Sequence, residues 1–464
     1  MTEPRRSATK MFDTSLRIAA AGPRGIPVVN NLRFLGVSYR YAMDTMAPFH
    51  QQPVVPVTGG NGSMVVAFGD AAVRQVFADN ATFQRADGVF NLPQGHPWSK
   101  MFEAVITANG DEHRRRRRLL MPVVQKSAMD HYREIFVDTF AGSRFAEPAN
   151  EQPFDMVDEF LRISKTNMLR GMLGLDDTKS NRDFASDVLI LAAAALTQPA
   201  VILLRWNRRF TPYGRWVARV ASAYDRLATL IEQRRTEPSR PDALSIICNT
   251  TDEAGDYLST PEIAGELHGL FAAGFETTAM TMTWALLTML AERSPLDPTD
   301  ATVIDAMVKE SQRLLPAVPM SLPRRVAQDV SIGGSAPVPA GSMLFLSAAV
   351  EHHNPAVYPE PFAFRPQRWL GQETPRPQSF FPFGIGARRC LGAAFADLQA
   401  RVTLGGIGTV LPRLRLLTTH VDYRMKTGVT GSPRAPIMVT FGTGTEGEPA
   451  PTPISGTVNV LWRR

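Results

Sequence analysis

Cys390 is the residue whose neighbours best suit chemistry. It lies between a glycine-rich stretch that ends at Gly386 and an apolar helix predicted to start at Ala393. Backbone N–H groups at a helix start and the two arginines just before the cysteine stabilise a thiolate, the form of cysteine that ligates metals. Most lone cysteines are small buried hydrophobes, and Cys248, which has no such surroundings, is predicted to be one of these. Cys390 is therefore the candidate metal ligand.

Glycine and aromatic residues around Cys390 leave room for a flat ligand. Gly386 permits a tight turn with positive φ, and Gly392 has no side chain to block a macrocycle that lies over the helix. Phe383 can shield the sulfur from water. The segment matches the pattern Phe-x-x-Gly-x-Arg-x-Cys-x-Gly position for position, at Phe383, Gly386, Arg388, Cys390 and Gly392.

In this segment the chain resembles the cytochrome P-450 superfamily, and further motifs follow the family's order from Pro23 to Phe441. The resemblance implies a haem b (iron protoporphyrin IX) with Cys390 as proximal ligand, whose electron donation favours cleavage of the O–O bond. It also implies that Arg388 pairs with a haem propionate. The implied activity is that of a soluble, bacterial-type haem-thiolate monooxygenase, which uses O2 to hydroxylate or epoxidise an organic substrate.

A long helix is predicted to cross the domain. Thr260 is a good N-cap with Pro261 at the first helical position, and no breaker other than glycine occurs before Pro295. The helix should therefore contain about 30 residues and measure roughly 45 Å. Such a helix is usually central.

That helix carries a polar turn, Glu276-Thr277-Thr278, in an otherwise apolar run. Glycine and back-bonding threonine weaken a helix interior, so a local distortion is expected here. The resemblance implies that this turn forms the oxygen-binding groove beside Ala273 and the haem. Thr277 would hydrogen-bond the bound oxygen, and Glu276 would relay protons as a general acid.

Glu310 and Arg313 are three residues apart in a predicted helix, so they share a face and could pair. Alone, this spacing indicates no more than an exposed ion pair. The segment from Phe364 to Trp369 resembles the family's segment whose arginine, here Arg368, joins that pair in a buried triad. The three residues would then be structural and would lock the loop that carries Cys390.

Five successive arginines, Arg114–Arg118, first suggest nucleic acid, but neither interleaved aromatic residues nor a basic tail accompanies them. On a helix, His113 and Arg117 lie on one face. The resemblance implies that these two residues hold haem propionates, that Arg325 does the same, and that the exposed basic face accepts an acidic ferredoxin or flavodoxin. That partner would receive its electrons from NAD(P)H through a reductase. Nucleic-acid binding is not expected.

The apolar segment Val188–Leu204 is interrupted only by Thr197, Gln198 and Pro199, and is predicted to form two helix ends and a loop. Its place in the chain resembles the family's lid over the substrate, although simple packing on the core is an equal alternative. Such a lid favours a lipophilic substrate, for example a terpenoid, polyketide or fatty acid of secondary metabolism. Further apolar walls are expected at Leu270, Phe271, Val318 and Met320.

Composition places these motifs in a globular protein. The chain has 464 residues, of which 44% are hydrophobic, and Lys and Arg number 50 against 44 Asp and Glu. We expect one domain over residues 1–445, with a loose Gly/Pro/Thr-rich tail over 446–464. The implied fold is mainly α with a small β-rich region, the triangular prism of the cytochrome P-450 fold with its long central helix over the haem. A hairpin is predicted around residues 59–62 and a β-rich stretch from Val330 to Leu346.

The N-terminus shows neither a signal peptide nor a membrane anchor, and two cysteines exclude a disulfide scaffold. A cytoplasmic monomer is expected. The fingerprint Gly442-Thr443-Gly444-Thr445-Glu446-Gly447 is followed by prolines that prevent a helix, so no reductase module is expected in the chain. Two alternatives stay open: a peroxide-driven haem-thiolate enzyme, and a non-catalytic haem protein or gas sensor.

Overall fold

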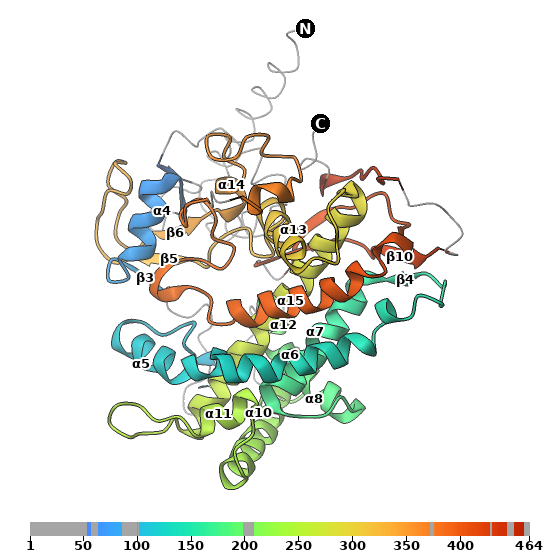
Figure 1. The fold of residues 1–464 in the computed structure, drawn as a ribbon. Helices are drawn as coiled ribbons and strands as arrows, with labels where there is room; N and C mark the ends of the chain where they lie inside the picture. Colours follow the sequence, from blue (N-terminus) through green and yellow to red (C-terminus); the bar gives the residue numbers. More distant parts are fainter. Residues whose placement is uncertain are drawn as a thin grey trace.

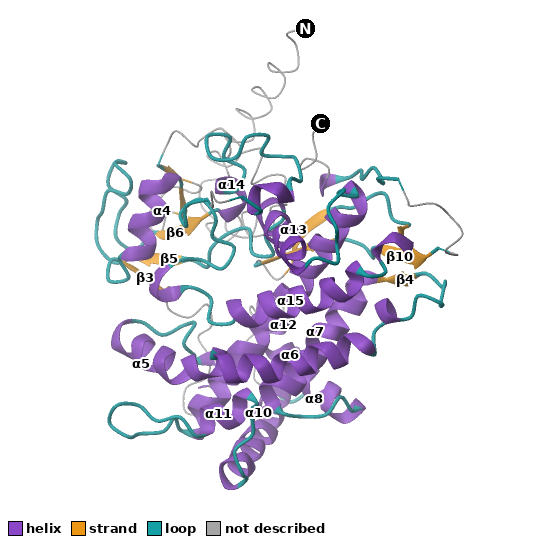
Figure 2. Cartoon of the chain, viewed as in Figure 1, coloured by secondary structure: helices purple, strands orange, loops and turns teal. Residues whose placement is uncertain are grey.

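The computed structural model describes residues 53–56, 64–85, 100, 102–197, 208–371, 375–426, 429–442 and 450–458. Helices fill the centre and the lower part of the molecule in Figure 2, and the strands lie at its upper margins. The helices are α4 (Gly69–Ala78), α5 (Gly110–Leu120), α6 (Lys126–Ala141), α7 (Met156–Leu173), α8 (Lys179–Thr197), α10 (Pro212–Thr236), α11 (Ala243–Cys248), α12 (Thr260–Glu292), α13 (Ala301–Leu314), α14 (Ala348–Glu351) and α15 (Ala393–Gly408).

The predicted long helix is α12, with 33 residues, and it runs through the middle of the helical part (Figure 1). Its N-cap is Ser259 rather than the expected Thr260, because the Ser259 side chain and Glu262 form a reciprocal capping box. The helix ends at Arg293, which adopts a left-handed conformation with φ 46°. Its C-terminal half, Thr278–Ala291, is buried on all sides, which is typical of a core helix.

Helices α7, α10, α13 and α15 all pack against α12. Buried side chains from α7, α12, α13 and α15 form the largest hydrophobic cluster, which includes Trp284 with 0% exposure. A second cluster joins α5, α6, α8, α10 and α11 to the N-terminal half of α12. It contains Cys248, whose pKa burial raises to about 11, so this cysteine is the buried hydrophobe that the sequence predicted.

The largest sheet has the order β1-β2-β6-β5-β3. Strands β1 (Val54–Pro56) and β2 (Met64–Ala67) pair antiparallel, which confirms the predicted hairpin. Strand β6 (Met343–Leu346) ends the predicted β-rich stretch and pairs parallel with β2, while β5 (Arg324–Val326) lies between β6 and β3 (Phe83–Arg85). The smaller sheets contain β4 (Phe154–Asp155), β10 (Met438–Phe441) and β7 (Leu414–Leu416), and β8 (Tyr423–Lys426) with β9 (Thr430–Pro433).

Short 3-10 helices complete the chain: η3 (Met121–Val124), η4 (Arg144–Ala146), η5 (Pro366–Trp369), η6 (Gly386–Arg388) and η7 (Leu411–Arg413). None of the described helices is long and apolar enough to cross a membrane.

The expectation of a loose C-terminal tail is wrong for its described part, residues 450–458. Ile454 and Val458 are 8% and 0% exposed and belong to the largest hydrophobic cluster. The Ser455 N–H donates to the Thr419 carbonyl at 2.7 Å, and the Thr457 N–H donates to Asp422 at 2.9 Å. Two apolar side chains spaced by polar residues are enough to anchor a segment that composition alone marks as a loop.

Only part of the predicted lid can be placed. Helix α8 extends to Thr197, and Val188 is 2% exposed within the second hydrophobic cluster. The side chains of residues 189–197 and the whole of residues 198–207 lie outside the described part, as does the dinucleotide-like fingerprint from Thr443 onward.

Candidate active site

The loop before α15 folds tightly around Cys390. Its N–H donates to the Phe383 carbonyl at 2.8 Å, which closes the turn on the residue that was expected to shield the sulfur. Gly386 has φ +72°, and a Cβ there would lie 3.0 Å from the Phe77 carbonyl oxygen on α4. Glycine is therefore required at this position both for its backbone conformation and for the close contact with α4.

The Cys390 side chain is exposed although protein surrounds the loop. Burial raises the pKa of the thiol, and the Gly392 N–H, Arg389 and Arg117 act in the opposite direction. The sequence predicted that the helix-start N–H groups and the two arginines before Cys390 would stabilise the thiolate. The Gly392 N–H and Arg389 do act in that sense, Arg117 adds to them unpredicted, and desolvation outweighs all three. A bound metal ion would add the further positive charge that deprotonates a thiol ligand.

A cluster of cationic side chains lies at one side of the loop. Burial lowers the pKa of Arg85 to about 9 and that of Arg324 to about 10, and in both cases repulsion from Arg388 adds to the effect. Burial also lowers the pKa of His113 to about 4, with contributions from Arg388, Arg117 and Arg324. Within the described ranges, no carboxylate pairs with Arg85, Arg324 or Arg388. The cluster suits a ligand with negative charge.

Asn109, which precedes α5, ties this cluster together and was not predicted. Its side-chain oxygen accepts from the Arg388 guanidinium at 2.7 Å and from the Arg85 N–H at 2.8 Å. Arg388 also donates to the Ala108 carbonyl at 2.8 Å, while its Nε atom is buried without a partner among the described residues. These contacts join residues far apart in sequence, so no local pattern could have revealed them.

Strand β5 places two neighbouring arginines on opposite faces. The sequence prediction chose Arg325, but side chains alternate along a strand, and here Arg324 is buried while Arg325 is exposed. The pairing of β5 with β3 places Arg324 opposite Arg85, whereas Arg325 faces the other way beside Gln84. Arg324 thus lies in the cationic cluster, while the propionate role expected of Arg325 stays a prediction.

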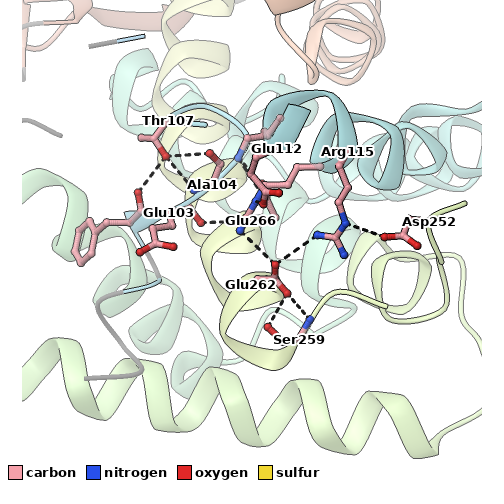
Figure 3. Close-up of polar contacts among 12 residues, drawn as sticks. Glu103, Ala104, Thr107, Glu112, Arg115, Asp252, Ser259, Glu262 and Glu266 are labelled. Carbon is pink, nitrogen blue, oxygen red and sulfur yellow. Dashed lines mark hydrogen bonds and ion pairs between the residues drawn. The ribbon is translucent and has the colours of Figure 1, made fainter. Parts of the chain in front are cut away.

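The arginine run on α5 is largely neutralised, contrary to the expected open basic face. Arg115 donates to Asp252 at 2.7 Å and lies 3.6 Å from Glu262 (Figure 3). Arg116 is 5% exposed, is 3.0 Å from the buried Glu266 and also contacts Glu112. These acids lie on α12, on the loop before it and on α5 itself.

The ion pairs of Arg115 and Arg116 determine how α5 is oriented. Its paired face, with Arg115 and Arg116, packs toward the start of α12, where Glu266 also accepts the Val105 N–H at 3.0 Å. His113 and Arg117 therefore lie on the opposite side, where Arg117 is close enough to Cys390 for the two to interact electrostatically. The predicted shared face of His113 and Arg117 is present.

The predicted polar turn of α12, Glu276-Thr277-Thr278, has one side accessible to solvent and one side buried. Ala273 is exposed and Thr277 partly exposed, while Glu276 is 8% exposed. The Thr277 hydroxyl donates to the Ala273 carbonyl at 2.5 Å and that of Thr278 donates to the Gly274 carbonyl at 2.6 Å. The back-bonding that was expected to distort the helix is present, but the helix runs through these residues without a break.

Glu310, Arg313 and Arg368 lie together beneath the cysteine loop. Glu310 and Arg313 are both fully buried and joined by paired contacts of 2.8 and 2.9 Å, and Arg368 lies 3.3 Å from Glu310. Trp369 also donates to Glu310 at 2.9 Å. The three residues therefore make the contacts that the resemblance implied.

His352 connects this triad to the cysteine loop, and the sequence prediction did not include it. Its carbonyl accepts from Arg313 at 2.9 Å, and its Nε2 accepts from the Phe381 N–H, also at 2.9 Å. A ring nitrogen that accepts must be unprotonated, and burial lowers the pKa of His352 to about 3. The adjacent pair His352-His353 was the only sequence signal.

The expected apolar walls are only partly accessible. Leu270, Val318 and Met320 each keep some exposed surface. Phe271 is 1% exposed within the second hydrophobic cluster, so this side chain packs in the core instead of lining a site.

The residues present fit a haem. Cys390 offers an accessible sulfur, and a Cβ on Gly392 would meet nothing within 4 Å, so the start of α15 leaves open space. The cluster of Arg85, Arg324 and Arg388 supplies unpaired positive charge of the kind that two propionates require. A cysteine loop, a cationic cluster and a central helix with a polar turn together define a haem-thiolate protein.

Comparison with known proteins agrees with this class. The family model described as Cytochrome P450 matches residues 21–294 and 297–441. The curated protein cytochrome P450 138 of Mycobacterium tuberculosis is 32% identical over 380 residues, which cover 77% of this chain and 81% of that protein. Cytochrome P450 137 of the same species is 27% identical over 431 residues, or 85% and 88% of the two chains.

Solved structures show the same fold. The haem domain of cytochrome P450DA has a TM-score of 0.72 at 18% identity, with 92% of this chain and 98% of that chain covered. The retinoic acid-bound cyanobacterial CYP120A1 has a TM-score of 0.69 at 20% identity, with 88% and 96% covered. The chain belongs to the cytochrome P450 family and is an oxygen-dependent monooxygenase.

Proposed function

We propose that this enzyme inserts one oxygen atom into a lipophilic organic substrate, such as a terpenoid, polyketide or fatty acid. The observation that carries the proposal is the apolar character of the accessible side chains on α12 near its polar turn and in the segment between α13 and β5. Ala273 is exposed there, and Leu270, Val318 and Met320 are partly exposed. A polar group left without a partner on such a surface would cost about 1 to 3 kcal/mol, so polar substrates are disfavoured.

Cys390 is proposed as the residue whose sulfur would hold the haem iron, with Phe383, Gly386 and Gly392 shaping the loop around it. Bound haem supplies the redox chemistry that splits dioxygen. Arg85, Arg324 and Arg388 would pair with its propionates, because their guanidinium groups lack carboxylate partners among the described residues. His113, which is uncharged at neutral pH, and the cationic Arg117 would complete the propionate side of the site.

Glu276 and Thr277, in the polar turn of α12, are proposed to hold and move protons for the reaction. The Thr277 hydroxyl can rotate from the Ala273 carbonyl, which it contacts at 2.5 Å, and donate toward substrate-side water instead. Glu276, the residue just before Thr277, carries a carboxyl that can resupply the proton. Ala273 has a small side chain, so the face of α12 beside Glu276 and Thr277 is not blocked.

The electrons are proposed to come from a separate ferredoxin or flavodoxin, reduced by an NAD(P)H-dependent reductase. Arg389 supports an acidic donor. It is exposed, it precedes Cys390 directly, and it has no carboxylate partner in the described ranges. It replaces Arg115 as the docking candidate, because Arg115 is already paired with Asp252 and Glu262.

The substrate proposal is tested by spectral titration. Lipophilic compounds should displace water and shift the purified holoenzyme from low to high spin, and polar compounds of equal size should not. Turnover should require NAD(P)H with the redox proteins. Efficient turnover with peroxide alone, or a response to polar compounds only, would contradict the proposal.

The donor proposal is tested by charge reversal. Arg389→Glu should slow reduction by the ferredoxin at least tenfold at low salt and weaken the salt dependence of the rate, because steering by the exposed charge is lost. Arg424→Glu reverses an exposed arginine on β8 and is the matched control. Equal reduction rates in the two variants would rule out this docking surface.

A further inference from the structure

Helix α7 packs against α12 beside the polar turn (Figure 1). Ser164 on α7 is 0% exposed, and its hydroxyl donates to the Phe275 carbonyl of α12 at 2.8 Å. The contact is close and specific, since a Cβ on Gly274 would lie 2.9 Å from the Met168 side chain of α7. Ser164 is therefore a buried hydroxyl from another helix that reaches the residue just before Glu276.

This bond belongs to a continuous series. The carbonyls of Ala273, Gly274 and Phe275 each accept a side-chain hydroxyl, from Thr277, Thr278 and Ser164 respectively. In an α-helix each of these carbonyls also accepts the N–H four residues later, which for Phe275 is that of Ala279. A second donor shares the lone pairs of the carbonyl and loosens the helix locally.

The three hydroxyls differ in origin. Thr277 and Thr278 bond back within their own turn and move with it, whereas Ser164 is fixed by α7. If the turn opens and the Ala279 N–H leaves the Phe275 carbonyl, Ser164 still satisfies that buried oxygen. Without Ser164, opening would leave the carbonyl unpaired, which is strongly unfavourable in a protein interior.

We propose that Ser164 is a positioning residue that lowers the cost of opening the α12 turn bearing Glu276 and Thr277. It acts through the Phe275 carbonyl and does not touch the reacting groups. The inference rests on the proposed proton-handling role of that turn. When the turn opens easily, the Thr277 hydroxyl can rotate toward water and the Glu276 carboxyl can move with it. A rigid turn holds the Thr277 hydroxyl on the Ala273 carbonyl.

The first test does not depend on catalysis. In the holoenzyme, Ser164→Ala should slow amide hydrogen exchange at Ala279 about fivefold, because the open state loses its hydrogen bond to Phe275. Residue-resolved mass spectrometry measures this rate. Ser311→Ala is the matched control, since Ser311 is 1% exposed on α13 and its hydroxyl has no partner among the described residues. Unchanged or faster exchange in Ser164→Ala would overturn the proposal.

The second test measures coupling. Ser164→Ala should retain haem and the spectral shift with substrate, yet lower product formed per NAD(P)H about two- to fivefold and release the remaining electrons as peroxide. Ser164→Cys keeps a side chain of similar size with a weaker hydrogen-bond donor, so its loss of coupling should lie between those of the native protein and Ser164→Ala. If the alanine variant does not fold, Ser164→Cys is used for both tests. Full coupling in Ser164→Ala, or the same loss in Ser311→Ala, would also refute the role.

A third variant separates this proposal from the function on which it rests. Thr277→Ala should uncouple the enzyme at least as strongly as Ser164→Ala. Full coupling in Thr277→Ala would show that the proposed role of the turn is wrong, whatever the exchange result. Uncoupling in Thr277→Ala together with normal exchange and coupling in Ser164→Ala would reject only the role of Ser164.

Discussion

Cys390 and the cationic side chains near it are held by different means. The cysteine is fixed by its own loop, through the Phe383 carbonyl and the left-handed Gly386. Arg85, Arg324 and Arg388 come from three distant segments and repel one another, which contributes to the lowered pKa of Arg85 and Arg324. A dianionic ligand between them would remove this repulsion, so ligand binding should stabilise the site.

The ligand role of Cys390 leads to a spectral prediction. Cys390→Ser should abolish the strongly red-shifted Soret band that the reduced carbon monoxide adduct shows with a thiolate ligand, because a hydroxyl is a far weaker donor to iron. Cys248→Ser is the control, since Cys248 is buried in the second hydrophobic cluster. It should keep the band even if its stability falls. Survival of the band in Cys390→Ser would contradict the assignment.

At the scale of elements, α13 and η5 are joined through one carboxylate. Glu310 accepts hydrogen bonds from Arg313 on α13, from Arg368 and Trp369 of η5, and from the Arg365 N–H just before it. Arg313 in turn donates to the carbonyls of His352, Pro361 and Ala363. The segment after α14 is thus clamped onto α13, and His352 transmits the clamp to Phe381 at the start of the cysteine loop.

Breaking this clamp should be costly. Glu310→Gln leaves the Arg313 charge buried without its carboxylate, and the free energy of unfolding should fall by about 3 to 5 kcal/mol. Asp305→Asn, which removes partly exposed ion pairs with Lys309 and Arg401 at the surface of α13, should cost less than about 1 kcal/mol. Urea unfolding of both variants measures the difference. Similar losses would show that the Glu310 network is not a special source of stability.

At the scale of the molecule, buried histidines link stability to pH, and His268 and His352 are two that lie away from the cationic cluster. Burial lowers the pKa of His268 to about 4 and that of His352 to about 3, against an ordinary value near 6.5. His268 also donates to the Val188 carbonyl. Its ring packs edge-on against Phe102, with the ring centroids 5.4 Å apart. The unfolded chain therefore binds protons that the folded protein excludes, so stability is lost as pH falls below about 6.5.

The expected loss is about 2 kcal/mol per histidine at pH 5 relative to pH 8. His268→Gln keeps a donor for Val188 but cannot titrate, so this variant should lose about 2 kcal/mol less than the native protein over that range. His131→Gln, at a partly exposed site on α6, is the control. Urea midpoints at the two pH values give the comparison. An identical pH dependence in native protein and His268→Gln would refute the linkage.

Much of the site was predictable because its signals are local. Gly386 before Cys390 is required by its backbone conformation, the length of α12 follows from its caps and lack of breakers, and Glu310 and Arg313 share a helix face by their spacing. The resemblance then supplied the family and its chemistry. Each of these features can be recognised within one continuous segment of the chain.

Only the tertiary structure decided which charges are available. Whether Arg324 or Arg325 points inward depends on how β5 pairs with β3, since a strand has two faces and the choice is made by a partner some 240 residues away. Arg116 is neutralised by Glu266 across 150 residues, so this arginine of the run is buried and not available to a partner. Ile454 and Val458 likewise find their core positions through contacts that composition does not encode. Long-range pairing determines burial, and burial determines which of these side chains can meet a ligand.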